Sequence, residues 1–516
     1  MRRVAIVGGG IAGLTAAYEL AKLARTGAPV EAVLFESSNR LGGLIETIRE
    51  GGFTIEGGPD GWVSAKPWAR ELAVELGLDS DDELISSNDA TRKTHIFLAT
   101  PDHPSGRLVA MPDGLNMMVP ASLAALGTLD RSPLFSEAAI AAYRAEPARA
   151  AELRASAPDH DESVADFTLR HFGPEVLERV AAPLLSGVFG GDVRRLSVRA
   201  VMPAFVQMER EHGSLIAALE TQAATQRASG GPQPAGIFTT LRSGLGTLVD
   251  RLVATIPPQW IRRNTAATAI RANAVSAAAE SLPAHHGSPP WTILTSTAGK
   301  HRGSETFDEV LLAVPVDAAR SLLAPLDQDA ANLLPTESTS AVLVAFAYTD
   351  AAQFALPPGF GFLVPPAHAH AEQVMDPAKS LLLACTFVDQ KFPHRAPPGG
   401  RLIRAFFGGA EAQRIARCNN DEIAAIARLE LTRILHSTAP AATHPLAPPP
   451  VLTIVRRWPN SLPQYPVGHL DRVAQFESRL RAMPCLAVLG NALHGVGIPD
   501  LIRDARAAAQ RAARGR

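Results

Sequence analysis

The sequence of 516 residues predicts an α/β fold in which segments from both ends of the chain complete one parallel sheet. Two observations lead to this prediction. The chain opens on a strand, a glycine turn and a helix, and near its end an apolar strand, a glycine loop and a helix follow one another. Between these units, residues 112–219 have the apolar period of helices, whereas the segments after Gly236 alternate as strands do. The longest helical run expected there covers residues 199–219.

The opening unit carries a Gly-x-Gly-x-x-Gly turn between an apolar run at residues 3–7 and a predicted helix at 14–24. In such a turn the first glycine permits the tight bend, the second lets backbone N–H groups approach a pyrophosphate, and the third lets the helix lie close to the sheet. The helix N-terminus then faces the anion. The predicted second strand, 30–35, ends at an acid that can accept hydrogen bonds from a ribose. The contacts expected from this unit are Gly8, Gly10, Ile11, Ala12, Gly13, Glu36 and Ser37.

Two glycine pairs follow the acid and help to identify the dinucleotide. The first is the run Arg40-Leu-Gly42-Gly43, and the second belongs to Gly57-Gly58-Pro59. Taken singly, Arg40 could be a surface ion-pair partner and the glycines could be loop residues. Their order resembles the superfamily of flavin-dependent amine oxidases and phytoene desaturases. That resemblance implies FAD as the cofactor, with Arg40 near its phosphates and the second glycine turn near its isoalloxazine ring.

The other end of the chain agrees with a flavin site. An apolar strand at 486–489 leads to Gly490 and Asn491, and a glycine loop at 495–500 precedes a helix at 501–513. A helix N-terminus here would face the flavin. The resemblance assigns the contacts to Gly490, Asn491, Val496, Gly497 and Ile498. Superfamily members often carry Asp in place of Asn491, and many carry Gly where this chain has Ala505.

Composition limits the function classes. Net charge is −2, and no dense basic cluster suggests a nucleic-acid surface. Three cysteines stand far apart without metal-ligand or Cys-x-x-Cys spacing, so we expect neither a metal site nor structural disulfides, and a cytoplasmic location is plausible. No signal peptide or apolar run of about twenty residues is apparent.

Further runs narrow the resemblance to the oxygen-dependent protoporphyrinogen oxidase family. They lie at 183–192, 241–248, 359–365, 406–409, 458–469 and 495–500. The resemblance covers nearly the whole chain. It implies oxidation of protoporphyrinogen IX in haem biosynthesis, with oxygen as electron acceptor and hydrogen peroxide as product. Close relatives oxidise coproporphyrinogen III instead, and these motifs do not separate the two substrates.

The resemblance also implies three parts. The Rossmann-type FAD-binding domain is discontinuous and would take residues 1–90, 237–310 and 451–516. A mainly antiparallel sheet domain for the substrate would take 91–111 and 311–450, and a helical inserted domain 112–236. In relatives the helical domain touches the membrane, so peripheral membrane contact stays open, as does a homodimer.

The proposed chemistry needs no side-chain nucleophile, because the flavin accepts the hydride while the protein orients the ring. By resemblance, Phe406 and Leu363 contact pyrrole rings, although both could instead be sheet-core residues. The propionates need a cation, and Arg92, Lys93 and His95 are equal candidates, with a solvated charged turn as the alternative. Trp458 is expected near the flavin and Ala267 near the adenine.

Two other interpretations remain. An amine oxidase of the same superfamily would show an aromatic cage beside the flavin, which is not evident between residues 490 and 499. A flavin-free protein of this fold that binds a lipidated partner would be colourless, so a visible absorption spectrum would identify it.

Overall fold

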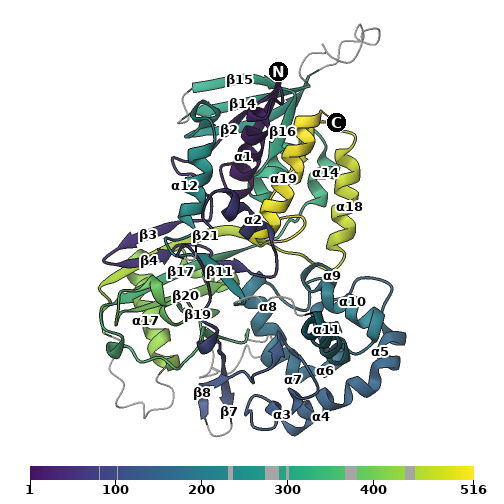
Figure 1. The fold of residues 1–516 in the computed structure, drawn as a ribbon, viewed down its shortest axis with the longest axis vertical. Coiled ribbons are helices and arrows are strands. Elements are labelled where there is room, and N and C mark those ends of the chain that lie inside the picture. The colour runs from purple at the N-terminus through teal and green to yellow at the C-terminus, as the bar shows by residue number, and fades with distance from the viewer. Residues whose placement is uncertain are drawn as a thin grey trace.

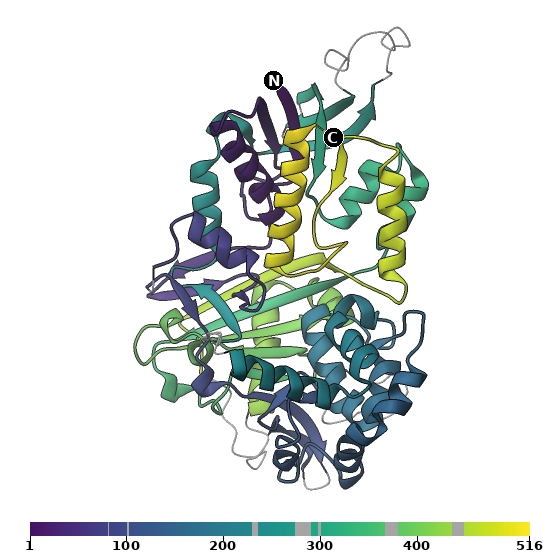
Figure 2. The ribbon, with the colours of Figure 1, turned by 45° about the vertical axis from the view of Figure 1, so that its right-hand side comes forward.

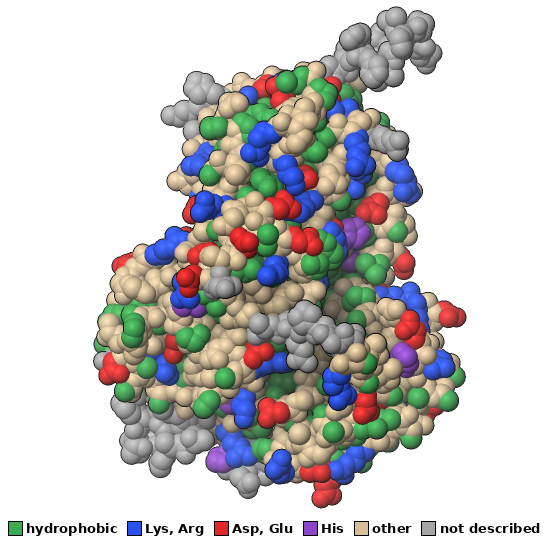
Figure 3. Space-filling view, viewed as in Figure 1, with side chains coloured by type: hydrophobic (Ala, Val, Ile, Leu, Met, Phe, Trp, Pro, Cys, Tyr) green, Lys and Arg blue, Asp and Glu red, His purple; other side chains and the backbone are tan. Residues whose placement is uncertain are grey.

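The structure, a computed structural model, describes residues 1–80, 82–100, 103–229, 236–273, 290–297, 301–366, 380–435 and 448–515. Its architecture is α/β with mixed sheets. Figures 1 and 2 show a part with a parallel sheet and both chain termini at the top, a large second sheet at the lower left and a group of helices at the lower right. On the face drawn in Figure 3, basic and acidic side chains are interspersed over all three parts.

The parallel sheet joins strands from both ends of the chain in the order β12-β2-β1-β16-β22. Its inner strands are almost wholly buried because helices cover one face and the sheet of β13 (Thr265–Ala272), β14 (Trp291–Thr297) and β15 (His301–Phe307) packs on the other, which explains their continuous apolar runs. The predictions of the first two strands and of the strand near 486 are therefore confirmed. The strands are β1 (Arg2–Val7), β2 (Val30–Phe35), β12 (Ile261–Arg262), β16 (Glu309–Leu312) and β22 (Leu486–Val488).

The first and last helices lie side by side on this sheet (Figure 1), α1 (Ile11–Arg25) against α19 (Ile498–Arg514). Gln510 donates a hydrogen bond to Glu19 at 3.2 Å. Ala505 is fully buried between them, so alanine suffices for close packing where relatives often carry glycine. Other elements of this part are α2 (Trp68–Glu75), α12 (Gly246–Thr255), α13 (Val316–Leu323), α14 (Gln328–Leu333) and α18 (His469–Leu480).

The second sheet has seven strands in the order β21-β17-β20-β19-β18-β7-β8. β21 pairs with β17 along most of its length, so residues 452–463 belong to this sheet rather than to the parallel one. The strands are β7 (Thr94–Thr100), β8 (His103–Ala110), β17 (Ser338–Tyr348), β18 (Gly361–Leu363), β19 (Ala384–Phe387), β20 (Arg401–Gly408) and β21 (Leu452–Pro463). Helices α15 (Val388–Lys391), α16 (Gly409–Ile415) and α17 (Asn420–Leu435) accompany it.

Three small sheets, all built from short strands, adjoin these parts in the described residues. They are β3 (Thr47–Glu50) with β4 (Phe53–Glu56), β5 (Trp62–Val63) with β11 (Phe238–Leu241) and β6 (Leu84–Ser86), and β9 (Leu115–Asn116) with β10 (Val119–Pro120).

The third part is helical, as predicted, but the expected helix at 199–219 is wrong. It is three helices, because Pro203 lacks the N–H that a continuous helix needs and Gly213 ends the next helix at a φ of +76°. The helices are α3 (Leu126–Leu129), α4 (Glu137–Ala145), α5 (Ala150–Ser156), α6 (Val164–Phe172), α7 (Pro174–Val176), α8 (Ala182–Phe189), α9 (Val198–Val201), α10 (Pro203–His212) and α11 (Leu215–Ser229). Among the described helices, none is both long and apolar enough to cross a membrane.

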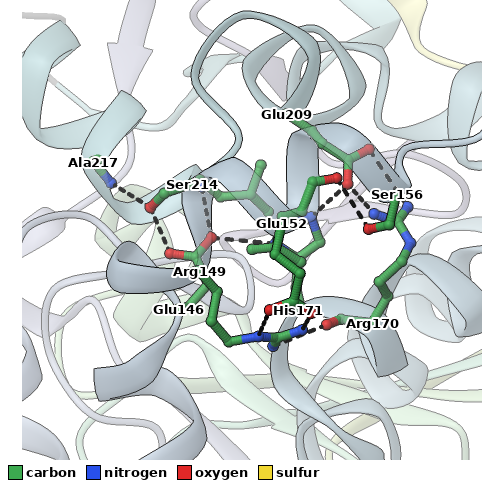
Figure 4. Close-up of polar contacts among 11 residues, drawn as sticks. Glu146, Arg149, Glu152, Ser156, Arg170, His171, Glu209, Ser214 and Ala217 are labelled. Atoms are coloured by element: carbon green, nitrogen blue, oxygen red, sulfur yellow. Dashed lines mark hydrogen bonds and ion pairs between the residues drawn. The ribbon is translucent and has the colours of Figure 1, made fainter.

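A sealed cluster of charged side chains ties these helices together (Figure 4). His171 on α6 lies between Glu146 and Glu209, with ring nitrogen to carboxylate distances of 3.2 and 2.9 Å. Arg170 pairs with Glu209 and with Glu162. Glu146 also accepts the backbone N–H of Leu215 at 2.7 Å, which satisfies the first turn of α11.

Candidate functional site

A cavity of about 1760 Å³ lies where the three parts meet. The β1–α1 turn and the loop before α19 form one end of it. The seven-stranded sheet contributes Leu363 and Phe406, and α8 contributes residues near Val188. The β1–α1 turn and the loop before α19, which come from opposite ends of the sequence, thus border the same cavity. The cavity is large enough for a dinucleotide and a second ligand.

The three glycines of the first turn are required for different structural reasons. A Cβ at Gly8, whose φ is +109°, would come within 2.2 Å of the Ala313 carbonyl oxygen, and one at Gly13 within 1.9 Å of the Gly8 carbonyl oxygen. Protein packing therefore explains these two. A Cβ at Gly10 would meet nothing closer than 4.0 Å. Because Gly10 lines the cavity, the space beside it is left to a ligand, as a pyrophosphate contact requires.

Glu36 stands at the end of β2 on the cavity wall, beside Ser37. Its carboxylate accepts the backbone N–H groups of Gly9 and Ser38, both at 2.8 Å. These bonds hold the acid beside the glycine turn, at the place where a ribose would follow the pyrophosphate. Ala267, on β13, lines the same end of the cavity.

Arg40 fixes the loop that carries the first glycine pair. Its guanidinium donates to the carbonyl oxygens of Leu41 at 3.2 Å and Ile45 at 2.7 Å, and to that of Gly43. Gly42 bridges to Gly10, so the two glycine segments cross in contact. Arg40 therefore stabilises this loop on the cavity wall through hydrogen bonds and does not serve as a surface ion-pair partner.

The second glycine turn lies just behind the wall. Pro59 lines the cavity, but Gly57 and Gly58 do not. A Cβ at Gly58 would come within 1.9 Å of the Leu44 carbonyl oxygen, so close packing on the first loop requires glycine. Trp458, which does line the cavity, donates its indole N–H to the Gly57 carbonyl at 2.7 Å.

The loop before α19 lines the cavity with Gly490, Asn491, Val496 and Gly497, and α19 contributes its first residue, Ile498. The Asn491 side chain donates to the Ser461 carbonyl at 2.9 Å. Tyr465 holds the loop, since its hydroxyl donates to the Asn491 carbonyl at 2.6 Å and accepts the N–H of Gly495 at 3.2 Å. Burial raises the pKa of Tyr465, so it stays neutral. Reasoning from the sequence did not assign this role to Tyr465.

On the sheet side, three cavity-lining residues share one rung. Leu363 on β18 pairs with Ala384 on β19, which pairs with Phe406 on β20. Side chains on one rung point to the same face of a sheet, and two strand spacings separate the outer pair by about 10 Å. Ala384, which lies between them, has the smallest side chain of the three.

The three predicted propionate cations lie off the cavity wall. Arg92 and Lys93 are exposed, whereas Thr94 beside them does line the cavity. His95 is buried, with its Nδ1 3.4 Å from the Gly361 carbonyl. Burial lowers the pKa of His95, so it is neutral at pH 7.

A buried ion cluster that sequence reasoning missed does reach the cavity. Asp60 and Lys391 both line it, and the Lys391 ammonium lies 3.1 Å from each oxygen of the Asp60 carboxylate. Arg404 pairs with Asp60 at 3.2 Å and donates to the Gly58 carbonyl. Burial alone would raise the pKa of Asp60, but the cations Lys391 and Arg404 outweigh it and lower that pKa to about 2. Asp60 follows Gly57-Gly58-Pro59 directly, which was the one available signal.

Within the described part of the chain, no group of three or more His, Cys, Asp or Glu side chains is arranged to hold a metal ion.

Comparison with known proteins agrees on the type of fold. The family model described as flavin-containing amine oxidoreductase matches residues 11–513. Coproporphyrinogen III oxidase of Bacillus subtilis is 31% identical, over 98% of this chain and 97% of its own. Protoporphyrinogen oxidase of Bos taurus is 30% identical, over 99% and 98%.

Solved structures extend the comparison. One from Exiguobacterium sp. 255-15, assigned as a protoporphyrinogen oxidase, superimposes with a TM-score of 0.75 at 27% identity, covering 100% of this chain and 99% of its own. Cyclohexylamine oxidase from Brevibacterium oxydans reaches a TM-score of 0.63 at 15% identity, with 99% of both chains covered, and shares the fold alone.

Proposed function

We propose that this chain, which belongs to the flavin-containing amine oxidoreductase family, oxidises a porphyrinogen in haem biosynthesis. Its cofactor is FAD, as in the family. The observation that supports the substrate best is the rung of Leu363, Ala384 and Phe406, an apolar surface that lines the same cavity as the dinucleotide loops. Full-length similarity to enzymes named for porphyrinogen oxidation supports the same proposal.

We assign the cofactor to the end of the cavity between the two glycine loops, where Gly10 leaves room for it. When bound, FAD accepts the hydride that the substrate loses. The residues that would hold it are the cavity-lining members of the first unit, Gly8, Gly10, Ile11, Ala12, Glu36 and Ser37, with Arg40, Gly42, Gly43, Ala267, Trp458, Gly490, Asn491, Val496, Gly497 and Ile498. Gly13 does not line the cavity and would support the turn from behind it. Pro59 would line the site of the flavin ring. Gly57 and Gly58 would support that site from behind the cavity wall.

The three parts then correspond to three proposed domains. The parallel-sheet part binds FAD, the seven-stranded sheet binds substrate, and the helices around α8 close the cavity. The range 452–463 goes with the substrate sheet because β21 is its edge strand. Segments outside the described residues are left unassigned.

Phe406 and Leu363 are the proposed contacts for the tetrapyrrole. A macrocycle with several rings needs a wide apolar surface, and a rung with two large apolar side chains about 10 Å apart suits it. Arg92 or Lys93 would meet propionates at the cavity entrance, next to Thr94. His95 is better suited to hold Gly361 in place, because it is neutral and buried.

Three finer points complete the proposal. Molecular oxygen is the acceptor that reoxidises the cofactor, and hydrogen peroxide is released. Coproporphyrinogen III ranks first, because the Bacillus subtilis relative carries that name, with protoporphyrinogen IX as the alternative. The location is cytoplasmic, with peripheral membrane contact through the helical part near the exposed Val188.

Anaerobic mixing tests the proposal. Coproporphyrinogen III, protoporphyrinogen IX and an aliphatic amine should be mixed separately with the purified protein while the visible flavin absorbance is followed. At least one porphyrinogen should bleach the flavin within seconds. Bleaching by the amine alone would replace the proposal with an amine oxidase, and a colourless protein would remove the flavin chemistry altogether. Turnover on the two porphyrinogens in one assay ranks them.

A further inference from the structure

Asp60 is a carboxylate held in place on the cavity wall by two ion pairs. Among the described residues that line the cavity, the carboxylates are Glu36, Asp60 and Asp500. Glu36 is engaged at the glycine turn, and Asp500 is paired with Lys66 at 2.6 Å. Asp60 thus remains as the acid nearest to the substrate sheet, since Arg404 on β20 pairs with it.

The partners of Asp60 place it beside the proposed ring contact. The Arg404 guanidinium lies 5.1 Å from the centre of the Phe406 ring and 3.2 Å from the Asp60 carboxylate. Arg404 itself is sealed from the cavity. A carboxylate has about four acceptor positions; Lys391 donates to two of them, and Arg404 adds an ion pair at 3.2 Å. Because Asp60 lines the cavity, its remaining acceptor capacity is available to a ligand there.

Lys391 is a poor candidate for binding a substrate carboxylate. Its ammonium is bound to both oxygens of Asp60 and lies 4.2 Å from the Phe238 ring centre and 5.0 Å from that of Phe392. Its charge is therefore satisfied within the protein. The pair presents the carboxylate, rather than the ammonium, as the group with capacity for a new hydrogen bond.

A porphyrinogen has the complementary chemistry. Its pyrrole nitrogens carry N–H donors, and removal of a hydride from a bridging methylene transfers two electrons and one proton to the cofactor. The tetrapyrrole is then left with one positive charge, which is discharged when a pyrrole N–H proton leaves. A fixed anion close to this charge stabilises it more in a dry cavity than in water.

We propose that Asp60 is a catalytic residue of this site: its carboxylate accepts pyrrole N–H hydrogen bonds from a porphyrinogen lying on Phe406 and stabilises the positive charge left by hydride removal. Lys391 and Arg404 are positioning residues that orient it. This inference rests on the proposed function.

Asp60 does not act as the base in this scheme. A group that titrates at about 2 releases a proton at once at neutral pH, so the pyrrole proton passes on to water. Its part is to orient the ring and to supply a charge already in place.

The test compares Asp60→Asn with a matched control, Asp389→Asn. Asp389 is also a partly buried acid paired with an arginine, Arg401 at 3.3 Å, but it does not line the cavity. With coproporphyrinogen III under anaerobic conditions, Asp60→Asn should lower the rate constant of flavin reduction at saturation by about 100-fold. Asp389→Asn should stay within about two-fold, and Asp60→Glu should recover at least about ten-fold over Asp60→Asn.

A binding measurement tests the role of Asp60 in substrate binding without turnover. Coproporphyrin III retains two pyrrole N–H groups, and quenching of its fluorescence gives its Kd. We expect Asp60→Asn to raise this Kd by about ten-fold, the loss of one charge-assisted hydrogen bond, while the Kd for FAD matches that of Asp389→Asn.

Should Asp60→Asn lose FAD, a second pair of variants decides. Lys391→Met removes one of the two positioning cations but keeps the Asp60–Arg404 pair, so it should lower the reduction rate by about ten-fold, and Asp60→Asn/Lys391→Met should lose about ten-fold more relative to it. Equal reduction rates for Asp60→Asn and Asp389→Asn, or for Lys391→Met and the double variant, would overturn the inference. A wild-type protein that neither porphyrinogen reduces would instead overturn the proposed function.

Discussion

The molecule contains two clusters of buried charge, built from similar groups but facing different surroundings. In the helical part, His171 lies between Glu146 and Glu209 and does not line the cavity described above (Figure 4). Where the three parts meet, Asp60 and Lys391 form a pair whose carboxylate reaches the cavity. A sealed cluster can only contribute to structure, whereas a cluster with one open side can also bind. Substitutions in the first should change stability, and substitutions around the cavity should change ligand affinity.

The largest effect is expected at the sealed cluster. His171→Ala would leave two buried carboxylates without their shared partner, which costs about 3–5 kcal/mol of unfolding free energy. Urea denaturation followed by circular dichroism measures it. His212→Ala, on an exposed turn of α10, is the control and should change stability by less than about 0.5 kcal/mol. A loss below about 1 kcal/mol for His171→Ala would show that the cluster is not structural.

The next largest effect is expected at the cofactor end of the cavity. Here a substitution should weaken ligand binding and leave the stability of the fold unchanged. Gly10→Val fills space that no protein atom occupies, so the fold should persist while the Kd for FAD rises by about 100-fold or more. Titration of the apoprotein, followed by flavin fluorescence, gives this value. Gly127→Val is the matched control, because a Cβ there also meets nothing within 4 Å but faces no cavity. A fully yellow Gly10→Val protein would contradict the placement of the pyrophosphate.

A smaller effect on the same side is expected at the substrate sheet. Phe406→Ala should raise the KM for the porphyrinogen by about ten-fold, since it removes one wall of the ring contact, and FAD should stay bound. Leu429→Ala, at an exposed leucine on α17, serves as the control in the same steady-state assay. Unchanged kinetics would remove Phe406 from the pocket.

The smallest effect is a pH dependence confined to the helical part. Burial alone would lower the pKa of His171, but Glu146 and Glu209 outweigh it and raise the pKa above 6.5. A raised pKa contributes stability that is complete below 6.5 and is lost as pH rises through the folded value. Hydrogen exchange in α6 and α10 should therefore accelerate beyond its intrinsic increase, by about ten-fold per pH unit between 6.5 and the pKa of the folded state. His171→Gln should abolish this additional acceleration of hydrogen exchange. An equal additional acceleration in α1 would show that the effect is not confined to the helical part.

Local patterns in the sequence predicted the parallel-sheet part well. The turn from Gly8 to Gly13 and its flanking strands depend on neighbours within about thirty residues, and glycine permits few alternatives there. The helix predicted at 199–219 failed because Pro203 and Gly213 were given too little weight. Residues 261–272 likewise form two strands rather than one, since Asn264 turns the chain at a φ of +53° between β12 and β13.

Tertiary pairing could not be predicted in the same way. Asp60 and Lys391 are 331 residues apart, and nothing near Lys391 indicates a cavity. The edge position of β21 is likewise set by its pairing with β17, a contact between segments more than one hundred residues apart. The propionate cations were placed by resemblance, and the cavity lining offers Thr94 at that position instead.

The packing of α19 on α1 has a consequence for biosynthesis. Glu19 and Gln510 are 491 residues apart, and one wall of the proposed FAD site comes from the loop that precedes α19. A ribosome has synthesised almost the whole chain before that wall exists. Under this proposal, loading of the flavin would follow translation, and chains that terminate before α19 would be colourless.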